Sequence, residues 1–350
     1  MANPTGPGPG PGGQGGMRQR DPRPAPLTRA QKWQVTLGLI NANVLAAVLI
    51  AVTQLLTRGN TDGGFYGISA TVLIPILMGF ASAYTWREVP LTGKGLAFWA
   101  LVNTIIGMAM AYFFLHEGTV CLVMACPLLY GTILVSTVIA AHLLRPKPGP
   151  IAVSVVPVLV GALLYDCLNP VKEYRSAVTT SVRVDAPPNV VFPHTVAFPP
   201  INAPATGLIN RVGLPWPVQT TVDAPEVGAT RRCVFSGNLV IGERITELTP
   251  GKSMTFAITS QPRYPEFTDH GKLLQGQITV TGNSDGTTTL TGTSWYAMRV
   301  YPAWYFGPWA DGIIHGVHYR VFDHIKALSE AEAAKRRLTA TAPQATMPSH

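Results

Sequence analysis

The stretch 295–328 decides the fold of the C-terminal half of this chain, and it reads WYAMRVYPAWYFGPWADGIIHGVHYRVFDHIKAL. Its first six residues are typical of a strand, and an aromatic run follows. From Ala310 to Leu328, apolar residues recur at spacings of three and four, which predicts one face of a long α-helix. The stripe consists of Ile314, Val317, Val321, Ile325 and Leu328. We therefore expect a helix whose apolar face is buried.

A second row on the same helix carries polar chemistry. Asp311, His315, His318 and Phe322 recur at the same spacing, so their side chains share one face. Such a row beside a core stripe is typical of a helix that closes a cavity. In a catalytic interpretation, one imidazole is a general base that Asp311 orients. In a structural interpretation, Asp311 charges the helix start and the histidines fill polar positions at the cavity rim. We predict no metal and no cofactor.

The composition indicates a membrane protein. Only 13% of the residues are charged, whereas soluble chains average about 25%. Residues 1–168 carry 10 Lys and Arg against 5 Asp and Glu, and residues 169–350 carry 16 against 13. The basic excess of the first part lies in a tail and in short connections, as topology determinants do. The second part shows no basic stripe interleaved with aromatic residues, so we expect no nucleic-acid partner.

Apolar runs define the first half of the chain. Residues 1–32 are a basic segment rich in Gly and Pro, which predicts a disordered tail. Region 33–168 follows, and about 20 apolar residues suffice to cross a bilayer. We therefore predict an α-helical transmembrane bundle of about five spans, at 34–56, 65–84, 95–115, 119–143 and 151–168.

Basic residues predict the orientation of these spans. They are dense before the first run, sparse after it, present after the second and fourth, and absent after the third. This alternation places the N-terminus in the cytoplasm of a bacterial cell and the C-terminal domain on the outer face of the cell membrane. If the last run does not cross, the domain is cytoplasmic instead.

Amides interrupt the spans at Asn41, Asn43 and Asn103. Polar groups inside a membrane line a transport path in one interpretation and form hydrogen bonds between helices in the other. The four cysteines have no spacing of zinc-ligand type, and Cys167 and Cys233 can pair only if both face an oxidising compartment.

Strand periodicity begins at Val178. Alternating residues predict a strand over 178–184, followed by a short helix over 189–198. The turn at Asp285 and Gly286 joins the last two of six further strands. Those strands are predicted at 219–223, 230–237, 239–248, 253–261, 274–282 and 287–300. We expect an α+β domain over 172–328 and a disordered tail over 329–350.

The opening of this domain suggests a family. Residues 182–192, VRVDAPPNVVF, form a strand that enters an Ala-Pro-Pro turn and a short helix. With the hairpin strands and the final amphipathic helix, this segment resembles the START-like superfamily, also called SRPBCC, of polyketide cyclases, dehydrases and lipid-transport proteins. The resemblance implies a helix-grip fold, in which a curved antiparallel sheet wraps around a long C-terminal helix and encloses an apolar cavity.

The resemblance also implies a hydrophobic or amphipathic ligand. We expect aromatic side chains to line the cavity and a few polar groups to orient a lipid-like molecule. The candidate ligand-binding residues are Trp295, Tyr296, Arg299, Trp304, Trp309, His315, His318 and Phe322. The expected function is ligand binding by a membrane-anchored domain. The alternatives are a cyclase or hydrolase that uses Asp311, His315 and His318, and a transporter or channel subunit in which the spans are the active part.

Overall fold

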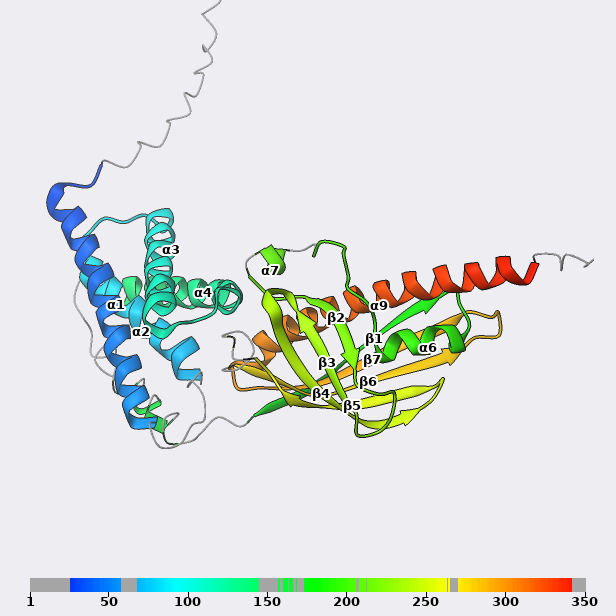
Figure 1. Ribbon diagram of the computed structural model, residues 1–350. Helices are drawn as coiled ribbons and strands as arrows, with labels where there is room; N and C mark the ends of the chain where they lie inside the picture. The colour runs from blue at the N-terminus through cyan, green and yellow to red at the C-terminus, as the bar shows by residue number, and fades with distance from the viewer. Residues whose placement is uncertain are drawn as a thin grey trace, which may run out of the picture.

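The computed structural model describes residues 26–57, 68–144, 157, 160–162, 164–165, 168, 173–205, 208–211, 213–262, 264 and 270–341. Figure 1 shows a helical bundle next to a domain built from a seven-stranded sheet and a long helix. Most of the predicted N-terminal tail lies outside the described residues, as do residues 342–350 of the predicted C-terminal tail, most of the fifth apolar run and Cys167.

The helical bundle contains three helices that are long and apolar enough to span a membrane, among the residues described. They are Arg29–Leu55, Gly93–Leu115 and Thr119–Leu143. The second predicted span is a shorter apolar helix, Thr71–Trp86. The structure therefore supports three candidate spans and does not support the predicted count of five. The elements are α1 (Arg29–Thr57), η1 (Ser69–Leu73), α2 (Ile74–Trp86), α3 (Gly93–Met110), η2 (Ala111–Leu115) and α4 (Thr119–Leu143).

Helix α1 begins four residues before the boundary that we predicted at residue 33. Thr28 and Gln31 explain this start, because the Gln31 N–H donates to Thr28 Oγ1 at 3.3 Å and the Thr28 N–H donates to Gln31 Oε1 at 3.0 Å. This reciprocal pair is a capping box, and it satisfies amide groups that the first helical turn leaves without partners.

Buried amides join the helices of the bundle. Asn43 Nδ2 donates to Asn103 Oδ1 at 2.7 Å, and Asn103 Nδ2 donates to Ser82 Oγ at 3.1 Å. Asn41 lies on the exposed side of α1. These bonds match the helix-to-helix interpretation of Asn43 and Asn103. Many large apolar side chains on the outer surface of the bundle are exposed, including Val48, Phe98 and Ile105, as expected for a surface that faces lipid.

The C-terminal domain contains one antiparallel sheet with the strand order β1-β7-β6-β5-β4-β3-β2. Its strands are β1 (Tyr174–Val184), β2 (Pro217–Val222), β3 (Thr230–Phe235), β4 (Leu239–Thr249), β5 (Ser253–Ser260), β6 (Gly271–Gly282) and β7 (Thr288–Met298). All seven predicted strands form. Register shifts in the β2–β3, β4–β5 and β6–β7 pairs, including the one between Leu273 and Gln275, bend the strands and increase the curl of the sheet.

Among the described residues of the domain, three helices accompany the sheet: α6 (Pro188–Val196), α7 (Leu208–Arg211) and α9 (Ala303–Thr341). In Figure 1, α9 begins next to the bundle and extends past the far end of the sheet. Phe322 packs so closely on β7 that a Cβ added at Gly292 would lie 2.3 Å from its Cζ atom. The curled antiparallel sheet and the long C-terminal helix fit a helix-grip domain.

Helix α9 is longer at both ends than the predicted 310–328. It begins at Ala303, so most of the aromatic run is helical, and it continues thirteen residues past Leu328. Ser329 and Ala333 are buried against the domain, which explains why the helix does not end at Leu328.

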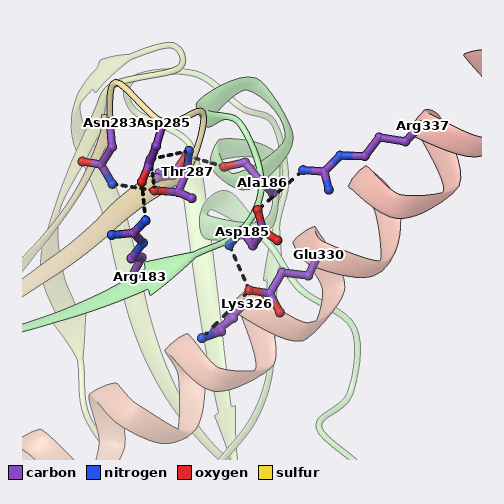
Figure 2. A network of polar contacts seen from close by, with 10 residues as sticks. Arg183, Asp185, Ala186, Asn283, Asp285, Thr287, Lys326, Glu330 and Arg337 are labelled. Atoms are coloured by element: carbon purple, nitrogen blue, oxygen red, sulfur yellow. Dashed lines mark hydrogen bonds and ion pairs between the residues drawn. The ribbon is translucent and has the colours of Figure 1, made fainter.

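Polar contacts hold this extension to the sheet. Figure 2 shows Glu330 accepting a hydrogen bond from the Asp185 N–H at 2.9 Å, with Arg337 3.5 Å from the Asp185 carboxylate. In the same view, Arg183 pairs with Asp285 in the β6–β7 turn. The sequence beyond Leu328 is polar, and these partners are distant in the chain, so local pattern did not predict the extension.

Candidate functional site

A cavity of about 650 Å³ lies at the junction of the bundle and the domain. Its bundle wall comes from the C-terminal halves of α1 and α3 and the N-terminal halves of α2 and α4, and its domain wall comes from β6, β7 and α9. Most of the lining is apolar. Met78, Val120 and Ile133 line it from the bundle, and Met298 and Val317 line it from the domain. Apolar surface therefore continues from the bundle into the helix-grip domain.

This position differs from a cavity enclosed by the sheet and the helix alone. Farther along α9, the space under the sheet holds a packed core with Phe192, Phe322 and Ile325 at its centre. At the bundle-facing turns of α9, a second cluster with Tyr296, Met298 and Phe306 packs beside the cavity, and the cavity opens toward the bundle. The bundle thus supplies one wall of the space.

Polar contacts fix the bundle against the domain around this cavity. The Glu117 carboxylate, just before α4, lies 2.9 Å from His270 Nε2, just before β6. Thr71 Oγ1 donates to the Tyr301 carbonyl at 2.6 Å, and Tyr305 Oη donates to the Met124 carbonyl at 2.7 Å. Glu117 and His270 both line the cavity, and neither was among the predicted site residues. A carboxylate between two apolar runs was the available signal for Glu117.

The two histidines of the predicted row converge on one hydroxyl group. Thr180 Oγ1 on β1 lies 2.7 Å from His315 Nδ1 and 2.9 Å from His318 Nδ1. His318 Nε2 lies 2.8 Å from Ser294 Oγ on β7. Burial and, to a smaller extent, the neighbouring His315 lower the pKa of His318 to about 4, so the His318 imidazole is neutral at pH 7. Ser294 and His318 line the cavity.

Asp311 contacts a tyrosine. Tyr296 Oη donates to Asp311 Oδ1 at 2.8 Å. Burial raises the pKa of Tyr296, and the bond to Asp311 raises it further, so the phenol stays protonated. The catalytic interpretation expected Asp311 to orient an imidazole. Among the hydrogen bonds of the described residues, Asp311 instead accepts from Tyr296. The described part of the chain contains no group of three His, Cys, Asp or Glu side chains suited to a metal ion.

Among the eight predicted ligand-binding residues, Tyr296 and His318 line the cavity. Trp295 alternates with Ser294 and Tyr296 on β7 and therefore faces the opposite side of the sheet. Phe322 is packed in the core, where it stacks on His318. The remaining four lie outside the lining: Arg299 is exposed near Glu173, Trp304 is 75% exposed, and Trp309 and His315 are half-buried. Their roles in ligand binding stay predictions.

Two buried oxygen atoms in the cavity wall have no hydrogen-bond partner among the residues that the structure describes. They are Glu117 Oε1 and Asn43 Oδ1. The second oxygen of Glu117 bonds to His270, and the Asn43 amide nitrogen donates to Leu39 O and to Asn103. Both unsatisfied atoms are acceptors, and an unsatisfied buried acceptor carries a desolvation cost.

Comparisons with known proteins give limited information about this chain. No protein-family model matches the sequence, and no curated protein matches it. Among solved structures, norcoclaurine synthase from Thalictrum flavum is 12% identical, with a TM-score of 0.32. The match covers 46% of this chain and 98% of the synthase chain. A protein from Nitrosospira multiformis is 16% identical, with a TM-score of 0.32, and the match covers 45% of this chain and 99% of that protein. An uncharacterised protein from Rhizobium leguminosarum is 11% identical, with a TM-score of 0.31, and the match covers 47% of this chain and 99% of that protein.

These likenesses are weak in sequence and cover less than half of the chain. The assignment of a helix-grip fold rests on the strand order and on the position of α9.

Proposed function

We propose that this chain is an integral membrane protein that binds a lipid-like amphiphile in the cavity between its helical bundle and its helix-grip domain. One observation carries the proposal: apolar side chains of α1–α4 and apolar side chains of β7 and α9 line the same cavity. A volume of about 650 Å³ lies within the range of roughly 300–1,000 Å³ typical of small-molecule sites.

The energetics favour an apolar ligand in this space. Each Å² of apolar surface removed from water contributes about 25 cal/mol, so the binding free energy comes chiefly from the body of the ligand. The few polar groups of the wall, such as Glu117, His270 and Tyr296, are suited to orient one end of it. Because the bundle forms half of the wall, we propose that the ligand enters from the membrane.

We also propose that the domain lies on the outer face of the membrane. Arg29, Lys32, Arg87 and Lys94 cluster at the end of the bundle where α1 begins and α2 ends, and basic residues mark the cytoplasmic side. The domain contacts the opposite end, through Thr71 and Glu117.

The chain leaves the bundle at its basic end, because Leu144 packs against Ala83 near the end of α2. It enters the domain at Glu173, which pairs with Lys272 at the cavity side. A return crossing by the run 151–168 is therefore part of the proposal. An activity reporter fused after His350 tests it: a reporter active only outside the cell should be active, and activity of a cytoplasmic reporter alone would contradict the orientation.

Photo-crosslinking of the full chain in lipid nanodiscs tests ligand binding. An alkyl chain that carries a diazirine should label lining residues such as Met124, Ile314 and Val317. Val317→Trp adds a large side chain to the cavity and should reduce this labelling. Tyr319→Trp is the matched control, since Tyr319 is 48% exposed on the same helix. Equal labelling of both variants would count against the cavity as the binding site.

A second candidate function is ester hydrolysis, and the pair of Ser294 and His318 favours it. One arrangement of protons satisfies the chain of groups: Ser294 Oγ–H donates to His318 Nε2, His318 Nδ1–H donates to Thr180 Oγ1, and the Thr180 hydroxyl donates to His315 Nδ1. This is the geometry of a serine nucleophile beside an oriented base. A conjugate acid with a pKa of about 4 makes His318 a weak base, which places binding ahead of hydrolysis.

Reaction of the chain with a fluorophosphonate separates the two functions. A hydrolase should be labelled at Ser294, and Ser294→Ala should abolish that labelling. The binding function predicts no labelling at Ser294.

A further inference from the structure

The wall of the cavity presents hydrogen-bond acceptors that no described residue satisfies. Glu117 is 8% exposed, and its Oε1 atom has no hydrogen-bond partner in the described part of the chain. Its Oε2 atom is occupied by His270 Nε2 at 2.9 Å, which fixes the carboxylate plane. The Asn43 Oδ1 atom, on α1, also has no hydrogen-bond partner among the described residues, and Asn43 lines the same cavity.

A buried acceptor without a donor costs free energy, and for a carboxylate the cost is larger than for a neutral group. A ligand that supplies a donor removes that cost, whereas a ligand that supplies only acceptors adds a repulsive contact. Most of the remaining lining is apolar and suits the body of the ligand. The end that reaches Glu117 therefore decides which amphiphiles bind.

Resting on the ligand-binding function proposed above, we infer that the ligand is an amphiphile whose head group donates hydrogen bonds, an alcohol or an amine, and that Glu117 binds that head group through Oε1. Amphiphiles whose head is a carboxylate, or an ether or ester without a donor, bind more weakly at this position.

The cations near Glu117 do not reverse this preference. Lys272 lines the cavity, but its Nζ atom is 2.9 Å from Glu173 Oε2. His270 directs Nε2 toward Glu117. Both groups are paired with carboxylates of the protein, so neither is left as an unpaired cation for an anionic head.

Native mass spectrometry of the full chain, released from detergent micelles, tests the inference with probes of matched length. 1-Methoxyhexadecane replaces the hydroxyl hydrogen of hexadecan-1-ol with a methyl group and so removes the donor, and hexadecylamine and hexadecanoic acid add the two charges. We expect the alcohol and the amine to bind about 10- to 100-fold more tightly than the methyl ether, the range for a hydrogen bond to a charged group.

Variants assign the preference to Glu117. Glu117→Leu removes both oxygens and should bring the alcohol and the ether to equal affinity. Glu173→Gln removes a carboxylate that does not line the cavity, and it should keep the preference for the alcohol.

The outcomes distinguish this inference from the function on which it rests. Equal binding of the alcohol and the ether to the wild-type chain would overturn the inference and leave lipid binding intact. A lost preference in Glu173→Gln, to the same extent as in Glu117→Leu, would overturn it too, since general charge would then be the cause. Failure of all four probes to bind would overturn the ligand-binding function itself.

Discussion

Glu117 and His270, 153 residues apart in the chain, meet at 2.9 Å and connect the start of α4 to the start of β6. Both side chains are largely buried, with exposed fractions of 7% and 11%. A buried pair of this kind stabilises the junction mainly because either partner alone would be left unsatisfied.

Removing one partner should loosen the junction. We expect His270→Ala to weaken the contact between bundle and domain by about 1–3 kcal/mol, the desolvation cost of a buried polar group left without its partner. Faster hydrogen exchange at residues 116–122 and 270–273 measures this. Lys272→Ala breaks a half-exposed pair with Glu173 and serves as the control, with little change expected. Equal exchange in the two variants would show that the Glu117–His270 contact does not hold the junction.

The ion pair of Arg231 and Glu243 should matter far more than surface pairs. Both side chains are at least nine-tenths buried, and Arg231 Nε also donates to the Val196 carbonyl at 3.0 Å. Arg231→Met leaves a buried carboxylate without its cation and should destabilise the domain by about 3–5 kcal/mol. Arg183→Met, which breaks the exposed pair with Asp285, should cost at most about 1 kcal/mol. The opening free energy from hydrogen exchange of β3 and β4 measures both.

The same variant should depend on pH in a defined direction. Burial raises the pKa of Glu243, and Arg231 opposes that rise. Without Arg231, the folded-state pKa lies higher still above the unfolded value, so the folded variant binds a proton that the unfolded chain releases. Its stability is therefore greatest at low pH and falls as the pH rises through the folded-state pKa. A destabilisation of Arg231→Met that is no larger at pH 8 than at pH 5 would contradict this account of the pair.

The lowered pKa of His318 should make the domain less stable in acid. Its folded-state pKa of about 4 lies below the ordinary value of 6.5, so the unfolded chain takes up a proton first as the pH falls. The stability is complete above pH 6.5 and decreases by roughly 3 kcal/mol as the pH falls to 4. His318→Gln should remove this part of the pH dependence, measured as the difference between the two unfolding curves. An imidazole proton resonance of His318 that titrates near pH 6.5 would refute the prediction.

Close packing at Gly292 can be tested by adding one methyl group. A Cβ there would lie 2.3 Å from Phe322 Cζ, so Gly292→Ala should force α9 away from β7 and cost about 1–3 kcal/mol. Phe322→Leu in the same chain should restore part of that loss, which a double-mutant cycle of unfolding free energies measures. Gly271→Ala, with its nearest neighbour at 3.6 Å, is the matched control on β6. Additive effects of the two core substitutions would show that the contact is not the cause.

The strands and helices of the domain were predictable because their signals are local. Alternation over 178–184 specifies which side of β1 is buried, helical spacing from Ile314 to Leu328 specifies a helix, and both elements form. The ends of α9 were not predictable, since the buried contact of Ala333 and the bond of Glu330 to Asp185 join residues far apart in sequence.

The candidate site, too, was predictable only where its signals are local. Helical spacing correctly places Asp311, His315 and His318 on one side of α9, yet it does not tell which partner each one meets across the sheet. Alternation on β7 could have separated Trp295 from Tyr296, because neighbours on a strand face opposite sides. The pairing of Glu117 with His270 depends on the packing of the bundle on the domain, which no local pattern encodes.

Retention of a native ligand by the full chain tests the central claim most directly. The chain would be purified from its membrane in a mild detergent, and the molecules extracted from it would be identified by mass spectrometry beside those of Val317→Trp. The proposed function predicts an apolar amphiphile that is enriched in the wild-type chain and depleted in the variant that fills the cavity. The same molecules in equal amounts from both proteins would contradict it, because they would then be bound outside the cavity.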